Sequence, residues 1–258
     1  MNRINTLFDN PSARGLLSLY FCAGTPEASD PAALITLLEG KGVDMVEIGI
    51  PFSDPMADGP VIQHAATRAL RNGCTLRRLI DDLRPVRQST TIPLLLMGYL
   101  NPIMQYGFEA LCRDAKAVGV DGFIIPDLPF ADYLAEYKPV ADRYDLRIIM
   151  LITPETSAER IRLIDEHTDG FIYMVSTAST TGAKESFAPS AIDYFSRIDA
   201  MHLRNRRMIG FGISNAATFS TACRYAAGAI IGSKFVSLLE SEPSPESAVD
   251  TLLRAIGR

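Results

Sequence analysis

One stretch of the chain does most to decide its fold, Val46–Pro60, which reads VEIGIPFSDPMADGP. It begins as an apolar strand and then turns through proline, serine, aspartate and glycine, so a buried strand ends in a loop here. The strand contains one carboxylate, Glu47, and the loop adds Asp54 and Asp58. Because burial disfavours a charged carboxylate, Glu47 needs a partner or a chemical use. A second carboxylate on the adjoining loop supplies the acid and base that proton transfer requires.

Short apolar runs of the same kind recur along the chain, and most are continuous rather than alternating, as in strands covered on both faces. We count eight: Leu16–Cys22, Met45–Ile50, Pro93–Met97, Gly122–Ile125, Arg147–Ile152, Phe171–Val175, Arg207–Phe211 and Ala229–Ile231. Segments with apolar residues three and four apart separate them and predict helices. This alternation predicts one (β/α)8 TIM barrel with extra helices, a single domain over residues 1–258. A doubly wound open sheet is the main alternative.

Composition excludes several classes of protein. The 258 residues are 47% apolar and 21% charged, with a net charge of −5 and a pI of about 5.3, so neither nucleic acid nor an anionic membrane is an expected partner. We see no apolar window long enough to span a bilayer and no secretory signal. The four cysteines form no C-x-x-C pair and predict free thiols in the cytoplasm. The three histidines lack metal-ligand spacing, so no metal site is predicted.

In a (β/α)8 barrel the chemistry lies at the carboxyl ends of the strands. Glu47 is near that end of the second predicted strand, and Asp58 is on the loop that follows. Both therefore fall on the predicted catalytic face. A role in the turn or in an interface is the better interpretation of Asp54, while Asp58 could also cap the next helix. A structural explanation is weakest for Glu47.

Two glycine loops indicate a phosphate site. The seventh predicted strand ends in Gly210–Ser214 and the eighth in Gly232–Lys234, and each loop opens a helix. Glycine lets backbone N–H groups approach an anion, and a helix N-terminus attracts negative charge. The same fold often binds phosphate at these two loops. A longer loop, residues 176–186, follows the sixth strand and could be either a lid or a flexible connection.

The run VEIGIPFSDPMADGPVIQ resembles the signature of the tryptophan synthase alpha chain family. The resemblance continues in order through GYLNP, IIPDLP, STTGA, GFGIS and GS, and it covers nearly the whole chain. It implies a (β/α)8 barrel lyase that cleaves indole-3-glycerol phosphate to indole and D-glyceraldehyde 3-phosphate in tryptophan biosynthesis. It also implies a heterotetramer with a beta chain, which receives the indole and holds pyridoxal phosphate, while the alpha chain has no cofactor of its own.

The resemblance also assigns roles to single residues. Glu47 and Asp58 match the two catalytic carboxylates. The implied substrate-binding residues are Tyr20, Ile125, Tyr173 and Phe211 around the indole, and Thr181, Gly182, Gly212, Gly232 and Ser233 at the lid and phosphate. The implied partner interface is Asp54, Pro55, Asn101 and Pro102. The lid sequence and Tyr20, where phenylalanine is common, depart from the family pattern. A stand-alone lyase and a non-catalytic activator of the beta chain remain the alternatives.

Overall fold

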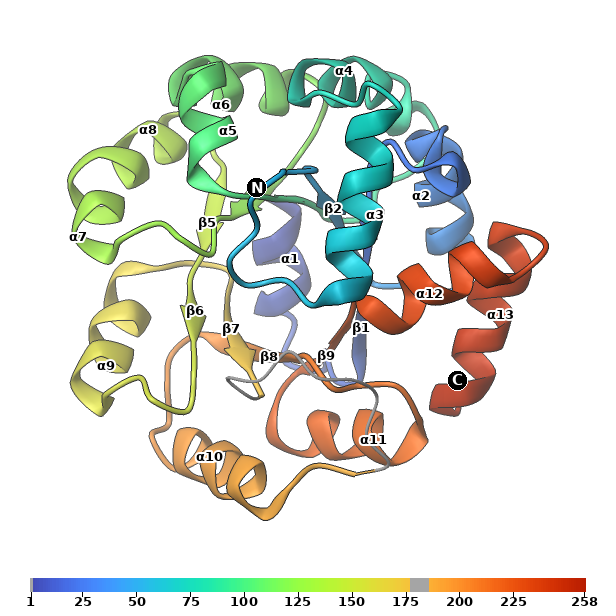
Figure 1. The fold of residues 1–258 in the computed structure, drawn as a ribbon. Coiled ribbons are helices and arrows are strands. Elements are labelled where there is room, and N and C mark those ends of the chain that lie inside the picture. The colour runs from blue at the N-terminus through green and yellow to red at the C-terminus, as the bar shows by residue number, and fades with distance from the viewer. Residues whose placement is uncertain (1, 177–185) are drawn as a thin grey trace.

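Parallel strands form a ring at the centre of the molecule, and helices surround it (Figure 1). The computed structural model describes residues 2–176 and 186–258. The strands are β1 (Leu16–Cys22), β2 (Met45–Gly49), β3 (Leu94–Met97), β4 (Gly122–Ile124), β5 (Arg147–Ile149), β6 (Leu151–Ile152), β7 (Phe171–Val175), β8 (Arg206–Gly210) and β9 (Gly228–Ile231). Their order is β5-β4-β3-β2-β1-β9-β8-β7-β6, and every neighbouring pair is parallel.

The two ends of this order belong to one predicted strand, since β5 and β6 are separated by Met150 alone. The backbone N–H of Tyr173 donates to the Met150 carbonyl oxygen at 3.0 Å, which carries the ladder across the break. The sheet is therefore a ring of eight strand positions, and the predicted barrel is confirmed over the doubly wound sheet. The seventh and eighth predicted strands are β8 and β9.

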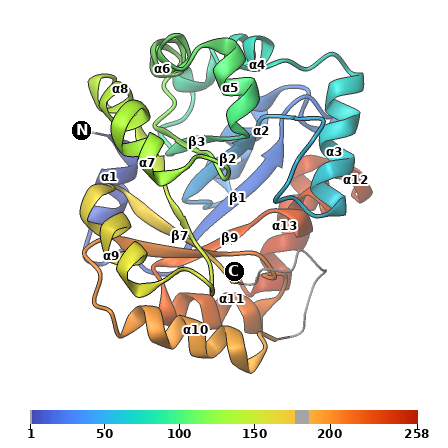
Figure 2. The same ribbon diagram turned by 60° about the vertical axis from the view of Figure 1, so that its left-hand side comes forward.

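Apart from α1, which precedes β1, the helices follow the strands along the chain and pack on the outside of the ring (Figure 2). They are α1 (Arg3–Asp9), α2 (Pro31–Gly40), α3 (Pro60–Arg71), α4 (Leu76–Asp82), α5 (Leu100–Tyr106), α6 (Phe108–Ala117), α7 (Phe130–Asp132), α8 (Lys138–Arg143), α9 (Ala158–His167), α10 (Pro189–Asp199), α11 (Ala216–Tyr225), α12 (Ser233–Ser241) and α13 (Pro245–Ile256). A π-helical turn, Tyr133–Tyr137, joins α7 to α8. Asp30, Thr75 and Asn215 cap α2, α4 and α11 with their side chains, which accept hydrogen bonds from the first backbone N–H groups of each helix.

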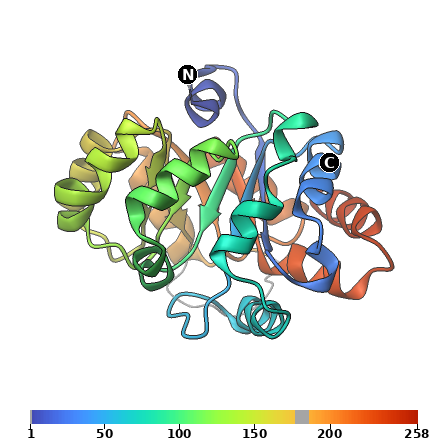
Figure 3. The same ribbon diagram turned by 90° about the horizontal axis from the view of Figure 1, so that it is seen from above.

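Helix α1 closes the amino-terminal end of the barrel, opposite the loop that follows β2 (Figure 3). Phe8 stacks on Phe171 inside the barrel with ring centroids 4.9 Å apart, and the Asn2 amide donates to the Asp121 and Asp145 carbonyl oxygens. This seven-residue helix was not predicted from the sequence, because so short a segment shows little periodicity. With this end closed, the opposite end is left to bind ligands.

The interior of the barrel below Glu47 is mainly apolar, with Ser18 as a buried polar side chain. Leu16, Met45, Leu95, Phe171 and Met208 belong to this inner cluster, and a second and larger cluster fills the space between barrel and helices. The four cysteines are free thiols. Among the described residues, no helix is long and apolar enough to cross a membrane, and no group of side chains is arranged to hold a metal ion.

Candidate active site

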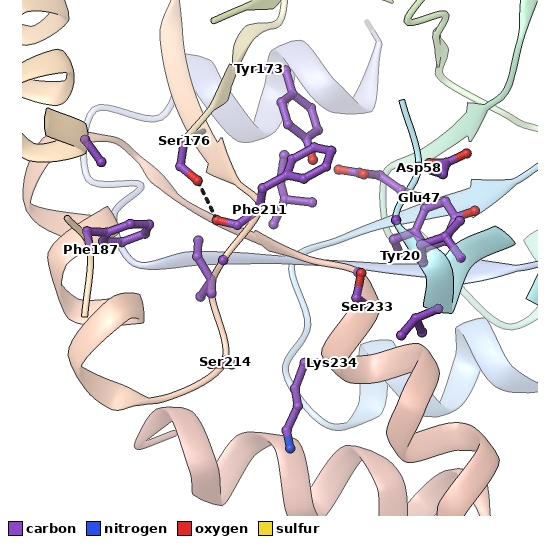
Figure 4. Close-up of a pocket in the computed structure, with 18 of the residues that line it drawn as sticks. Tyr20, Glu47, Asp58, Tyr173, Ser176, Phe187, Phe211, Ser214, Ser233 and Lys234 are labelled. Carbon is purple, nitrogen blue, oxygen red and sulfur yellow. Dashed lines mark hydrogen bonds between the residues drawn. The ribbon is translucent and has the colours of Figure 1, made fainter. Parts of the chain in front are cut away.

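A cavity of about 930 Å³ opens at the carboxyl ends of the strands, on the face opposite α1. Its volume suits a small organic ligand. Residues from strands, from the loops that follow them and from helix starts line it, including Tyr20, Glu47, Asp58, Met97, Tyr173, Phe211, Gly212, Ser214, Gly232, Ser233 and Lys234. The barrel therefore brings both predicted catalytic carboxylates to one cavity (Figure 4).

Glu47 is completely buried on β2, and its two carboxyl oxygens have different surroundings. The Ser18 hydroxyl donates to Oε1 at 3.0 Å, whereas Oε2 has no hydrogen-bond partner among the described residues. Burial raises the pKa of Glu47 to about 8, and the Ser18 hydrogen bond is a smaller effect in the opposite direction. At neutral pH this side chain is therefore mostly a carboxylic acid, with one oxygen available at the cavity.

Asp58 lies on the loop after β2, just before α3, and is half buried. The Tyr99 hydroxyl donates to its Oδ2 at 2.9 Å and accepts the Ala57 backbone N–H at 2.9 Å. The Phe52 ring packs beside Tyr99 with centroids 5.5 Å apart. Burial raises the pKa of Asp58, while the Tyr99 hydrogen bond lowers it. One buried tyrosine thus fixes both the carboxylate and the backbone that carries it.

Two tyrosine rings lie flat over neighbouring strands because two glycines leave room for them. A side chain at Gly49 would place its Cβ 2.0 Å from the Tyr20 hydroxyl, and one at Gly210 would come within 2.2 Å of the Tyr173 hydroxyl. Burial raises the pKa of each tyrosine well above its ordinary value, so both stay neutral. The two rings are apolar walls of the cavity with a neutral hydroxyl at each tip.

Phe211 forms a further wall, and its backbone is strained. It takes a φ of +70°, which is rare for a residue with a side chain and is often found at functional sites. The Ser176 hydroxyl donates to the Phe211 carbonyl oxygen at 2.7 Å, and the Phe211 ring meets Tyr173 edge-on at 6.3 Å. The following residue, Gly212, has a φ of +73°, a conformation that glycine adopts without strain.

The predicted phosphate end lies on the same side of the cavity as α11 and α12. Gly212 and Ser214 precede α11, while Gly232 caps α12, whose first residues are Ser233 and Lys234. The first N–H groups of a helix have no partner within the helix and point toward an anion placed at its start. Lys234 adds a positive charge to this part of the lining (Figure 4).

The other predicted site residues are placed differently. Ile125 is buried between barrel and helices and is absent from the described lining of this cavity. It follows Ile124, which faces the barrel interior, and alternate residues of a strand face opposite ways. Thr181 and Gly182 lie outside the described residues, as does most of the loop predicted as a lid.

The predicted partner interface lies at the surface near the cavity. Asp54 and Asn101 are exposed, while Pro55 and Pro102 are half buried. Two exposed methionines adjoin these residues, with Met56 78% and Met104 60% accessible.

Two residues of the site, Ser18 and Tyr99, were missed by sequence reasoning. A signal existed for Ser18, which puts a hydroxyl into the apolar run Leu16–Cys22 on the same face as Tyr20. Tyr99 lies within the GYLNP motif but carries no sign of its contact with Asp58, 41 residues earlier.

Comparison with known proteins identifies the family. The sequence model of the tryptophan synthase alpha chain matches residues 9–256. The chain is 63% identical to the tryptophan synthase alpha chain of Phocaeicola vulgatus over 257 residues, which is 99% of each chain. This chain belongs to the tryptophan synthase alpha chain family. It is therefore a lyase of tryptophan biosynthesis.

Solved structures of tryptophan synthase have the same fold. The alpha subunit of Legionella pneumophila is 33% identical and superposes with a TM-score of 0.88 over 99% of this chain and 97% of that one. A chain of the tryptophan synthase complex of Pyrococcus furiosus is 31% identical and gives 0.83 over 95% of this chain and 97% of that one.

Proposed function

We propose that this chain cleaves indole-3-glycerol phosphate to indole and D-glyceraldehyde 3-phosphate by a retro-aldol reaction, with Glu47 and Asp58 as its catalytic carboxylates. The observation that carries this proposal is the state of Glu47, a buried acid whose Oε2 has no partner and which lines the cavity. Because its pKa is about 8, it holds a proton at neutral pH and can still release it.

Cleavage needs a proton at indole C3. Transfer from Glu47 Oε2 to C3 turns the ring into an electron-poor iminium. The side-chain hydroxyl then loses its proton, its oxygen forms the aldehyde C=O, and the electron pair of the breaking carbon–carbon bond returns to the ring. Glu47, now a carboxylate, accepts the hydroxyl proton, so that the enzyme ends in its starting state.

Asp58 is assigned to the ring nitrogen. As C3 gains its proton, the indole N–H becomes more positive, and an ionised carboxylate that accepts it stabilises this charge. Tyr99 hydrogen-bonds to Asp58 Oδ2 and so favours the ionised form. We therefore assign the acid role to Glu47, which is fully buried, and the base role to Asp58, which is only half buried and accepts the Tyr99 hydrogen bond.

The rest of the cavity orients the substrate. Tyr20, Tyr173 and Phe211 offer flat apolar surfaces for the indole ring. The loop at Gly212, which precedes α11, and the start of α12 at Gly232 bind the phosphate. Binding energy from the phosphate, remote from the breaking bond, then holds C3 against Glu47. Thr181 and Gly182 are assigned to the lid and phosphate on the family pattern alone. Ile125, which is buried between barrel and helices and is absent from the described lining of the cavity, is given no role in binding. We treat residues 1–258 as one barrel domain for this reaction.

A tryptophan synthase beta chain is the proposed partner, in an alpha2beta2 assembly that passes indole to the pyridoxal phosphate of the beta chain. The exposed methionines Met56 and Met104, beside Asp54 and Asn101, supply an apolar surface for such a contact. The relatives from Mycobacterium tuberculosis and Pyrococcus furiosus were solved as tryptophan synthase and as its complex. The free thiols fit a cytoplasmic location.

The test is indole release from indole-3-glycerol phosphate by the purified chain, with and without a beta chain. We expect slow release that accelerates when the beta chain is added. Fast release that ignores the partner would favour a stand-alone lyase. Absence of release from folded protein, together with activation of the beta chain, would leave only the activator role.

A further inference from the structure

Ser18 lies inside the barrel, below the substrate cavity. Strand β1 pairs with β2 in the register Ser18↔Met45 and Tyr20↔Glu47. Ser18 therefore faces the barrel interior two residues before Tyr20 and lies diagonally across from Glu47. Its side chain is fully buried. A buried hydroxyl needs a hydrogen-bond partner, and the partner of Ser18 is Glu47 Oε1, at 3.0 Å.

This contact makes the two oxygens of the Glu47 carboxyl group unequal. Oε1 accepts the Ser18 hydrogen, which disfavours a proton on that same oxygen. Oε2 has no partner among the described residues, so a proton on it competes with no hydrogen bond. Figure 4 shows the Glu47 carboxyl group pointing into the cavity on the side of Tyr173. A proton on Oε2 is therefore the one that a ligand in the cavity can receive.

We infer that Ser18 is a positioning residue for Glu47: its hydroxyl occupies Oε1, fixes the orientation of the carboxyl group and keeps the transferable proton on Oε2. This inference rests on the proposed function, in which Glu47 is the proton donor. Without the hydroxyl, the carboxyl group could rotate and place its proton on the oxygen that faces away from the substrate. Such a loss lowers the rate of the chemical step rather than the affinity for substrate.

The same hydrogen bond has a consequence for titration. Donation to Oε1 stabilises the carboxylate and partly opposes the effect of burial, so its removal raises the pKa of Glu47. The titratable side chains that sense the charge of Glu47 are Tyr20 from β1 and Tyr173 from β7, and both also sense the charge of Asp58. Burial keeps both tyrosines neutral, so neither titrates in the range where Glu47 does.

The experiment compares Ser18→Thr with Ser18→Val, which have nearly the same shape and differ in the hydroxyl. Ser18→Ala removes the hydroxyl without adding bulk and serves if the larger side chains impair folding. Thr168→Val is the matched control, because the hydroxyl of Thr168 is also buried and donates to the Ile164 carbonyl oxygen, away from the cavity. Each variant is assayed for kcat and KM across pH. The pKa of Glu47 is measured by 13C NMR of labelled glutamate carboxyl groups, assigned by its loss in Glu47→Gln.

We expect Ser18→Val and Ser18→Ala to lower kcat about tenfold with KM within about twofold, the size of effect of one hydrogen bond to an ionisable group. In both variants the 13C titration of Glu47 should move to higher pH, and so should the part of the kcat pH profile that follows this titration. Ser18→Thr and Thr168→Val should keep the wild-type values. Equal kcat and equal Glu47 titration in the wild type and Ser18→Ala would overturn the inference. If the wild type released no indole, the proposed function would fail, but the NMR titration would still decide whether Ser18 controls this carboxyl group.

Discussion

Tyr99 provides a sharp test of how the Asp58 loop is held. Tyr99→Phe removes one oxygen atom and two hydrogen bonds, one to Asp58 Oδ2 and one from the Ala57 N–H, each 2.9 Å long. The ring and its contact with Phe52 remain. A hydrogen bond to a charged group contributes about 1.5–3 kcal/mol and a neutral one about 0.5–1.5 kcal/mol. Because Asp58 and Ala57 are half buried, water can replace part of each bond, and we expect a loss of about 2 kcal/mol.

If this free energy keeps the carboxylate in its productive orientation, kcat/KM should fall roughly thirtyfold. The acid limb of the pH profile should also move to higher pH, because the Tyr99 hydrogen bond favours ionised Asp58 and its loss raises the pKa. The assay is indole release by the isolated chain from pH 5 to 9, with urea unfolding of each variant. Tyr133→Phe is the control, since that buried hydroxyl donates to the His167 carbonyl oxygen instead. A Tyr99→Phe rate within twofold of wild type, with the acid limb unmoved, would refute this reasoning.

Three other changes test separate features of the site. Gly212→Val forces a β-branched residue to a φ of +73°, so KM should rise at least about tenfold with little change in kcat, and an unchanged KM would exclude this loop from the phosphate site. Lys234→Met should raise KM severalfold at low salt, because Lys234 adds a positive charge near the proposed phosphate site, and the difference from wild type should shrink at high salt. Equal KM values at low salt would exclude a charge contact between Lys234 and the phosphate. The wild type should lose stability relative to Glu47→Gln as pH rises from 4.5 to about 8, because over this range the carboxyl group is ionised in the unfolded chain but still protonated in the folded one. Thermal unfolding of both proteins at pH 5 and pH 9 measures this, and an equal difference in stability between them at the two pH values would contradict the raised pKa.

The sequence predicted the barrel because its signal is repeated and local. Continuous apolar runs alternate with helical segments, and each run falls on a strand of the structure. The bounds differ by at most one residue at either end, and only the run Arg147–Ile152 is divided, at Met150. The short helices α1 and α5 were missed, since seven residues provide too few apolar positions to show a period. The apolar spacing over residues 190–204 predicts a helix of that length, but α10 ends at Asp199 and His202 then takes a φ of +50°.

Glu47 could be singled out from the sequence because a carboxylate in an apolar strand is unfavourable wherever its neighbours lie. Its partner Ser18 could not, since that contact depends on the register between β1 and β2, 29 residues apart in sequence. The same reason applies to Tyr99 and Asp58. Ile125 illustrates a further limit: whether it faces the cavity or the outer core depends on the position where β4 ends. Residue types are visible in a sequence, whereas the pairing that gives each carboxyl group its protonation state appears only in the folded chain.

The measurement that tests the central claim most directly is kcat for indole release by the wild type and by Glu47→Gln, with saturating indole-3-glycerol phosphate at neutral pH. Glutamine keeps the shape of the side chain and removes the transferable proton. General acid–base catalysis contributes about 100- to 10,000-fold, so we predict a loss of at least about 100-fold in a variant that folds and binds the substrate normally. A Glu47→Gln enzyme that retains kcat within a few-fold of the wild type would contradict the assignment of Glu47 as the proton donor.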